Sequence, residues 1–220
     1  NPWTGCSNIK RFDCASPYFL INDGILYSSD YRIIYGLIYW HQNIVIDNRT
    51  KQICADAFWS SKSTHIDLCN VLIIGDAAFC NCASASFDIA GAIEVLNCHS
   101  FSNCKLLERI DLSKVETIPN YAFNNCENLK KVTLSSKLKI VSKGSFNGCK
   151  SLETINIPNM VTYISEDAFY DCTALSKIII AEDNKDYCSI DGVLFNRNVT
   201  KLIIYPAAKK NKRYEIPKSV

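Results

Sequence analysis

The sequence has little net charge and few glycines. Its 24 basic and 22 acidic residues leave a formal charge of +2, which gives no reason to expect nucleic acid or an anionic membrane as partner. Only 8 glycines occur in 220 residues, and none forms a phosphate-binding loop. No apolar run reaches the roughly 18 residues of a membrane span, and residues 1–14 lack the basic start and apolar stretch of a signal peptide. We therefore expect no membrane span in this chain.

Histidine is scarce as well. The three histidines are His41, His65 and His99. They fall at non-equivalent places in the repeats described below, whereas a cysteine or serine nucleophile needs a histidine within hydrogen-bond reach and a third group that orients it. We therefore expect no catalytic residues and no enzyme activity.

The dominant feature of the sequence is a repeat of phenylalanine followed three positions later by cysteine. It occurs at Phe79 and Cys82, Phe101 and Cys104, Phe123 and Cys126, Phe146 and Cys149, and Phe169 and Cys172. Counting Phe58 as the first, successive phenylalanines at the repeat position are 21, 22, 22, 23 and 23 residues apart. This period is typical of a solenoid, whose coils cannot bury their apolar side alone and must stack. We expect one elongated, mostly β solenoid over residues 1–220, with long faces for binding.

One repeat unit shows what each position does. Ile155 and Ile157 alternate around Asn156, the period of a strand, and Pro158 ends it. A second extended piece, residues 161–164, leads to a turn at residues 168–169. Stacking such coils in register predicts a parallel sheet whose strands are joined by short turns or 3-10 pieces.

The middle residue of each strand triplet is expected to point outward, so these residues form a column. The column reads Asp67, Asp88, Asp111, Thr133, Asn156 and Ile179. Neighbouring strands lie about 4.8 Å apart, and stacked like charges destabilise a sheet. Two interpretations remain open: Arg109, Lys131 and Lys177 offset the carboxylates, or the column is an acidic stripe for a basic partner or a divalent cation. These six residues are our candidate binding site.

Twelve cysteines are present, and six of them share the repeat position. These six are Cys6, Cys82, Cys104, Cys126, Cys149 and Cys172; Ser61 stands at the same position in an early coil. We expect them to form an inward structural ladder of small buried hydrophobes, where a parallel array rarely offers disulfide geometry. The others, Cys14, Cys54, Cys69, Cys80, Cys98 and Cys188, are compatible with free or paired thiols. Structural zinc needs two Cys or His pairs at ligand spacing, so we expect no metal at Cys80, Cys82, Cys98 and His99 and no cofactor.

Two segments repeat each other near the ends of the chain. Residues 22–27 match residues 190–195, and each contains Asp-Gly between apolar residues, a strong hairpin signal. We divide the chain into a hairpin-bearing coil at 14–43, regular repeats at 44–180, and a second hairpin-bearing coil with the start of a further repeat at 181–220. The native chain is therefore expected to continue.

The second hairpin unit also carries a basic cluster. Its members are Lys209, Lys210, Lys212 and Arg213. Such a cluster is usually a solvated loop, and the alternative is contact with an anionic partner such as a sulfated glycan.

The pattern resembles a known family. The strand Leu152 to Pro158, the piece Val161 to Ile164, the turn Ala168 to Cys172 and the hairpin unit at 191–217 look like BspA-like leucine-rich repeats of the Treponema pallidum type. The resemblance implies a leucine-rich repeat solenoid without enzymatic residues. It also implies a surface or secreted protein that binds a protein ligand in adhesion to host cells or extracellular matrix; the alternative is a cytoplasmic leucine-rich repeat scaffold. If the chain is exported, Asn48 and Asn198 head possible glycosylation tripeptides.

Overall fold

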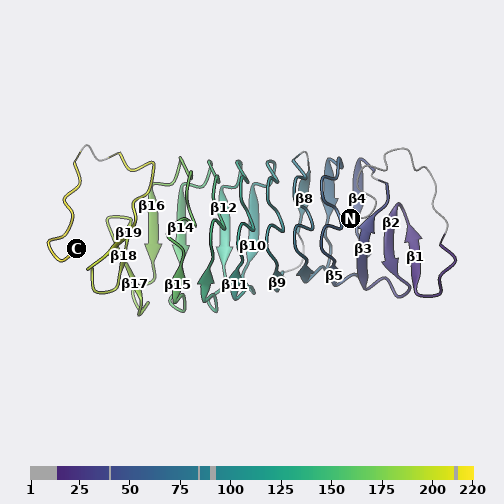
Figure 1. Cartoon of the computed structure of the whole chain (residues 1–220), viewed down its shortest axis with the longest axis horizontal. Coiled ribbons are helices and arrows are strands. Elements are labelled where there is room, and N and C mark those ends of the chain that lie inside the picture. Colours follow the sequence, from purple (N-terminus) through teal and green to yellow (C-terminus); the bar gives the residue numbers. More distant parts are fainter. Residues whose placement is uncertain (1–13, 40, 84, 90–92, 211–212) are drawn as a thin grey trace.

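The chain forms an elongated solenoid built of stacked β coils (Figure 1). The structure is a computed structural model that describes residues 14–39, 41–83, 85–89, 93–210 and 213–220. Within these ranges the strands are joined by turns, and no residue is helical. The mostly β solenoid expected from the period is confirmed. Cys6 lies outside the described residues.

One long side of the solenoid carries the strands that hold the candidate column. They are β4 (Asn43–Val45), β6 (His65–Asp67), β8 (Ser86–Asp88), β10 (Arg109–Leu112), β12 (Lys131–Leu134), β14 (Thr154–Ile157) and β16 (Lys177–Ile180). They pair in parallel and in register, so that Ile44, Ile66 and Phe87 lie side by side, as do Ile155 and Ile178. The outer residues of each triplet point inward and the middle ones outward.

This side is divided into three sheets. The hydrogen-bonded groups are β4-β6-β8, β10-β12 and β14-β16, and the coils at β8 and β10 are visibly farther apart (Figure 1). We attribute the first break to Phe87, whose bulky ring stands where other coils have isoleucine or valine. It packs edge-on against Phe79 and Phe101, with ring centroids 5.3 and 5.4 Å apart.

A second ladder of short strands runs beside the first. Its strands are β5 (Gln52–Ile53), β7 (Ile73–Ile74), β9 (Val95–Leu96), β11 (Thr117–Ile118), β13 (Ile140–Val141) and β15 (Tyr163–Ile164). In this ladder the carbonyl of the inward residue accepts an N–H from the next coil, as in Ile53 with Gly75 at 2.9 Å. The ladder breaks between β9 and β11. Pro119 stands at the position that should donate to Leu96, and proline has no N–H.

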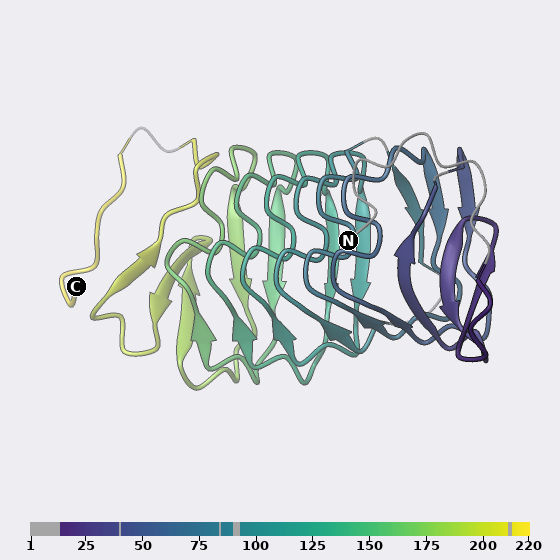
Figure 2. The ribbon, with the colours of Figure 1, turned by 45° about the vertical axis from the view of Figure 1, so that its right-hand side comes forward.

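Each end of the described chain carries an antiparallel hairpin (Figure 2). The strands are β1 (Phe19–Asn22), β2 (Ile25–Ser28) and β3 (Ile33–Leu37), and β17 (Tyr187–Ile190), β18 (Val193–Asn196) and β19 (Leu202–Ile204). Both turns have φ above zero at Asp and Gly, 48° and 75° at Asp23 and Gly24, as hairpin turns require. The register shifts at matching places, between Leu26 and Tyr27 and between Leu194 and Phe195. The two predicted hairpins thus have the same turn conformation and the same position of the register shift.

The core is a stack of phenylalanine rings along the solenoid axis. The stacked rings are those of Phe58, Phe79, Phe101, Phe123, Phe146 and Phe169. Successive ring centroids are 5.1 to 5.8 Å apart, and all six side chains are buried. The residue two positions after each ring has left-handed φ, including Asn103 at 60° and Gly148 at 71°. Asparagine, aspartate and glycine tolerate this conformation best, so the turns around the rings depend on them.

The repeat cysteines form a column next to the rings. Those described are Cys82, Cys104, Cys126, Cys149 and Cys172, all buried. Each thiol donates to the carbonyl of the phenylalanine of the preceding coil, at 3.0 to 3.3 Å. Burial raises the pKa of the Cys82 and Cys172 thiols to about 12, so they keep their protons. The column therefore links successive coils by thiol hydrogen bonds.

Candidate binding surfaces

A groove opens where β8 and β10 separate. It measures 450 Å³ and is lined by Asp67, Phe87, Asp88, Ile89, Arg109, Ile110, Asp111, Lys131 and Thr133. We call it the acidic groove. Its walls are strands of two different sheets, so the facing edges of β8 and β10 are not joined in a ladder. Four of the six candidate residues, Asp67, Asp88, Asp111 and Thr133, thus line one surface.

The three carboxylates of the acidic groove have modest local partners. Asp67 and Asp111 each accept the backbone N–H two residues on, at 2.8 and 2.9 Å, which stabilises the turn after the strand. Asp88 lies opposite Asp67 in the register, with its Oδ2 3.5 Å from His65 Nε2. Asp88 and Asp111 are exposed, and Asp67 is half-buried.

The positive side chains are distributed unevenly along the same face. Arg109 and Lys131 are opposite one another in β10 and β12 and line the acidic groove. Lys177 lies opposite Thr154, outside the groove. Asn156 and Ile179 are likewise neighbours in a separate sheet. The six-residue column therefore has two parts. The first is acidic and has the two cations Arg109 and Lys131 beside it, and the second, beyond β12, consists of the polar Asn156 and the apolar Ile179.

The described histidines are dispersed. His41 Nε2 lies 3.1 Å from Asp23, His65 contacts Asp88, and the His99 ring stacks on Tyr121 at 5.1 Å. In the part of the chain that the structure describes, no three His, Cys, Asp or Glu side chains are grouped to hold a metal ion. No disulfide joins any of the eleven described cysteines in the structure.

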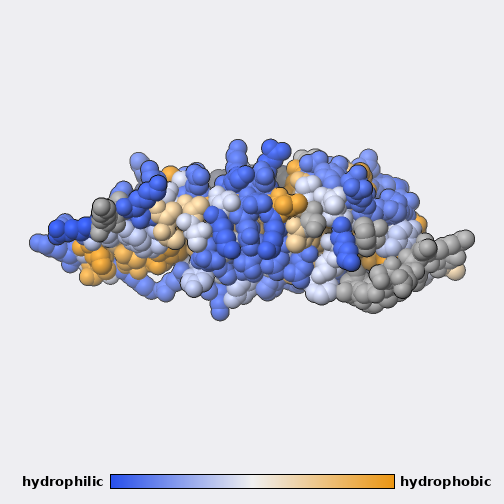
Figure 3. Space-filling view, turned by 90° about the horizontal axis from the view of Figure 1, so that it is seen from above, coloured by the Kyte–Doolittle hydropathy of each residue, from blue (hydrophilic) through white to orange (hydrophobic). Residues whose placement is uncertain are grey.

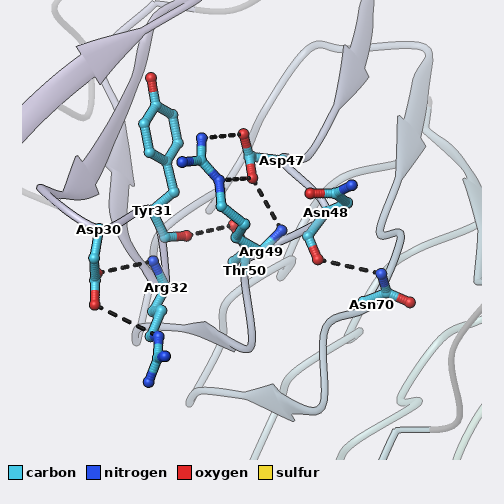
Figure 4. A network of polar contacts seen from close by, with 8 residues as sticks. All are labelled: Asp30, Tyr31, Arg32, Asp47, Asn48, Arg49, Thr50 and Asn70. Carbon is cyan, nitrogen blue, oxygen red and sulfur yellow. Dashed lines mark hydrogen bonds and ion pairs between the residues drawn. The ribbon is translucent and has the colours of Figure 1, made fainter.

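The possible glycosylation tripeptides both lie in turns. Asn48 and Asn198 are exposed. Thr50 is fully buried, and its hydroxyl donates to the Tyr31 carbonyl at 2.8 Å (Figure 4). Arg49, the residue between, pairs with Asp47 and lies 3.8 Å from the centre of the Tyr31 ring. The first tripeptide therefore has a structural explanation that does not require a glycan.

The basic cluster of the second hairpin unit is smaller than the sequence indicates. The Lys209 side chain is only 7% exposed, and its Nζ binds the Asp191 carboxylate at 2.7 Å and the Asp191 carbonyl. Arg213 pairs with Glu215 at 3.1 Å, and Lys212 lies outside the described residues. Lys209 thus anchors the hairpin turn and is not available to an anionic ligand.

A second groove lies beside β15, and sequence reasoning missed it. It measures 560 Å³ and is lined by Lys143, Tyr163, Ile164, Ser165, Glu166, Asp167, Tyr187, Lys201 and Ile203. We call it the edge groove. It is assembled from four parts of the chain, and the one signal in the sequence was the start of the second hairpin, which interrupts the ladder after β15.

The face of the molecule seen in Figure 3 is mostly hydrophilic over the middle coils, with apolar patches on either side of them. Exposed apolar side chains include Tyr163 at 52% and Ile179 at 45%. Within the described ranges, no helix has the length and apolar character of a membrane span.

The comparison with protein families agrees with this architecture. A model of the BspA type leucine-rich repeat region matches residues 40–126 and 98–210, with 6 copies. The chain belongs to the BspA-type leucine-rich repeat family. Proteins of this family are protein-interaction modules, and the resemblance expected from the repeat unit is confirmed.

Solved structures share the BspA-type fold. A leucine-rich cell surface protein from Faecalibacterium prausnitzii is 22% identical with a TM-score of 0.74, over 93% of this chain and 66% of that one. The pneumococcal vaccine antigen PcpA is 24% identical with a TM-score of 0.58, over 93% and 49%. A T. pallidum leucine-rich repeat protein is 20% identical with a TM-score of 0.62, over 76% and 81%. The chain thus spans less than two thirds of the first two proteins. No curated protein matches it.

Proposed function

We propose that this BspA-type chain is a non-enzymatic recognition module, displayed on a cell surface or secreted, that binds host cells or extracellular matrix through a protein ligand. The acidic groove carries the proposal, because its lining combines three carboxylates with the apolar side chains of Phe87 and Ile89. Protein interfaces commonly have such an apolar centre with polar surroundings. The similarity to a protein named as a cell surface protein supports the location.

The partner that fits the acidic groove is a protein segment with a basic side chain. Asp67 and Asp88 on the β6–β8 side and Asp111 on β10 would receive the cation, while Arg109 and Lys131 on the β10–β12 side would repel a second one placed there. Thr133, Asn156 and Ile179 extend the same face and would contact the remainder of the ligand. Attraction by the aspartates and repulsion by Arg109 and Lys131 would therefore fix the position of the ligand along the groove.

Charge removal tests this role directly. Replacing Asp67, Asp88 and Asp111 together by Asn should weaken binding to immobilised matrix proteins by about tenfold, without lowering the melting temperature, since stacked carboxylates repel each other. A matched control carries Glu153→Gln, Asp171→Asn and Glu182→Gln, which change net charge equally at exposed sites outside both grooves. Higher stability with unchanged binding in the first variant would reject the acidic groove as the site.

A second candidate is an intracellular scaffold built from the same repeats. One observation favours it: the eleven described cysteines are free, and reduced thiols are typical of intracellular compartments. The ladder thiols are uninformative because burial protects them anywhere, but Cys54, Cys98 and Cys188 are partly exposed. A thiol count on protein from its native source, folded and denatured, separates the two: pairing of the partly exposed cysteines supports export.

A further inference from the structure

The edge groove contains the open end of the second parallel ladder. In the coils before it, the inward carbonyl accepts an N–H from the following coil, as from Ile118 to Ser142 at 3.0 Å and from Val141 to Ser165 at 2.9 Å. The next carbonyl in this series belongs to Ile164, and it has no hydrogen-bond partner among the described residues. Strand β15 is therefore an edge strand, with β13 on one side only.

The side chain of Tyr187 takes the place of a backbone at this edge. Its hydroxyl accepts the Ile164 N–H at 3.0 Å and donates to the Thr162 carbonyl at 3.4 Å. A neighbouring strand would offer a carbonyl and an N–H to the same two groups. The Tyr187 hydroxyl thus satisfies two backbone groups of this edge, the Ile164 N–H and the Thr162 carbonyl. The Ile164 carbonyl stays open to a further hydrogen-bond donor.

The walls of the edge groove indicate what would lie on this edge. Lys201 is paired with Glu166 at 2.5 Å. The Asp167 carboxylate accepts the Ser165 hydroxyl at 2.6 Å and the Gly144 N–H at 3.2 Å, which lower its pKa. Lys143 also lines the groove, so that its two cations, Lys143 and Lys201, balance its two anions, Glu166 and Asp167.

Apolar surface flanks the open backbone. The Tyr163 side chain is 52% exposed on the outward face of β15, and Ile203 of β19 is partly exposed on the other wall. A charge-balanced groove with aromatic and aliphatic walls favours an uncharged apolar segment.

We propose that the edge groove binds an extended, uncharged segment of a partner protein, which adds to β15 as a parallel strand. The added strand takes its hydrogen bonds from Ile164, replaces the Tyr187 hydroxyl, and packs an apolar side chain between Tyr163 and Ile203. Strand addition of this kind takes affinity from the main chain and specificity from alternate side chains. The inference rests on the binding role proposed above and adds a second site with a different preference.

The probe is a phage library of linear random peptides selected on the full 220-residue chain. Peptides that bind the edge groove should alternate apolar β-branched or aromatic residues, should keep their affinity in 1 M salt because no net charge is paired, and should slow amide exchange at Ile164. Selected peptides that are all basic, that are displaced by salt, or that protect other amides would overturn the proposal.

Three variants make the test specific. Tyr163→Lys should weaken these peptides about tenfold, because lysine on an edge strand opposes pairing. Tyr170→Lys, at a tyrosine that is even more exposed and lies outside the groove, should have no effect. Tyr187→Phe should bind as tightly as the wild type or tighter, since it removes the competing hydroxyl; loss of binding would show that the hydroxyl itself is the ligand contact and would reject strand addition.

The proposals for the two grooves can be rejected independently of each other. The Asn variant of Asp67, Asp88 and Asp111 should leave these peptides unaffected, and Tyr163→Lys should leave matrix binding through the acidic groove unaffected. Unchanged matrix binding in the Asn variant would therefore contradict only the role of the acidic groove, and unchanged peptide binding in Tyr163→Lys only that of the edge groove.

Discussion

The Cys126 thiol lies 3.1 Å from the carbonyl oxygen of Phe101, one coil away. The same carbonyl also accepts the backbone N–H of Cys104 at 3.1 Å, within its own coil. One oxygen thus closes the turn after Phe101 and binds the next coil. The relationship repeats at every described ladder cysteine, so the cysteine column couples the coils along the axis as the ring stack does.

Replacing Cys126 by Ala should destabilise the solenoid. The change leaves a small cavity and removes one hydrogen bond from a buried carbonyl, which together cost about 1–2 kcal/mol. Urea unfolding followed by circular dichroism measures the difference. Cys188→Ala, at a partly exposed site in the second hairpin, is the matched control and should cost less than half as much. Equal losses would show that the ladder position has no special role.

Stability should fall at alkaline pH because of the same thiols. Burial raises the folded pKa of Cys82 and Cys172 to about 12 and also raises that of Cys126, whereas an unfolded cysteine titrates near about 8.5. The unfolded chain therefore loses protons first, and stability that is complete below about pH 8.5 declines from there toward pH 12, on the order of 1 kcal/mol per thiol per pH unit.

The pH series can be checked by melting temperature between pH 7 and pH 10.5. Cys126→Ala should show a shallower decline than the wild type, because one thiol is missing. Cys54 is only partly buried, and although burial also raises its pKa, Cys54→Ala should reduce the slope less than Cys126→Ala does. A decline of the same slope in Cys126→Ala and the wild type would mean that other groups, such as Tyr27 with its pKa raised to about 12 by burial, account for the effect.

Gly148 should be difficult to replace by Ala. Its φ of 71° is left-handed, and a Cβ there would collide with the Asn125 amide oxygen. We expect Gly148→Ala to cost about 1–2 kcal/mol. Gly148→Asn should cost less, because asparagine tolerates this conformation. Its amide could also continue the series in which Asn125 donates to Asn103 at 3.1 Å. The order of the two melting temperatures decides the point.

Much of the fold was accessible from spacing alone. The Phe58 to Phe169 period predicted the coils, the alternation around Asn156 predicted the strand direction, and Asp-Gly at residues 23–24 and 191–192 predicted both hairpins. The breaks in the sheets were harder to foresee. Pro119 is visible in the sequence, but its effect depends on the knowledge that Leu96 lies one coil below it.

The candidate surfaces divide in the same way. The acidic column was readable as a pattern, and its binding role remains a prediction, as does the division at residues 14–43, 44–180 and 181–220. The gap between β8 and β10, which places three aspartates in the lining of a groove, depends on how the Phe87 ring packs between two neighbours. Lys209 looked like a surface charge until its contact with Asp191 was known.

The sequence by itself determined that coils of 21 to 23 residues stack with their rings and thiols inside, because a periodic apolar pattern has one way to be buried. Only the tertiary structure decided where that stacking is interrupted, and so where grooves lie. An interruption depends on whether one backbone group meets a partner in the next coil. Residues more than twenty positions apart decide this, as Tyr187 and Ile164 do at 3.0 Å.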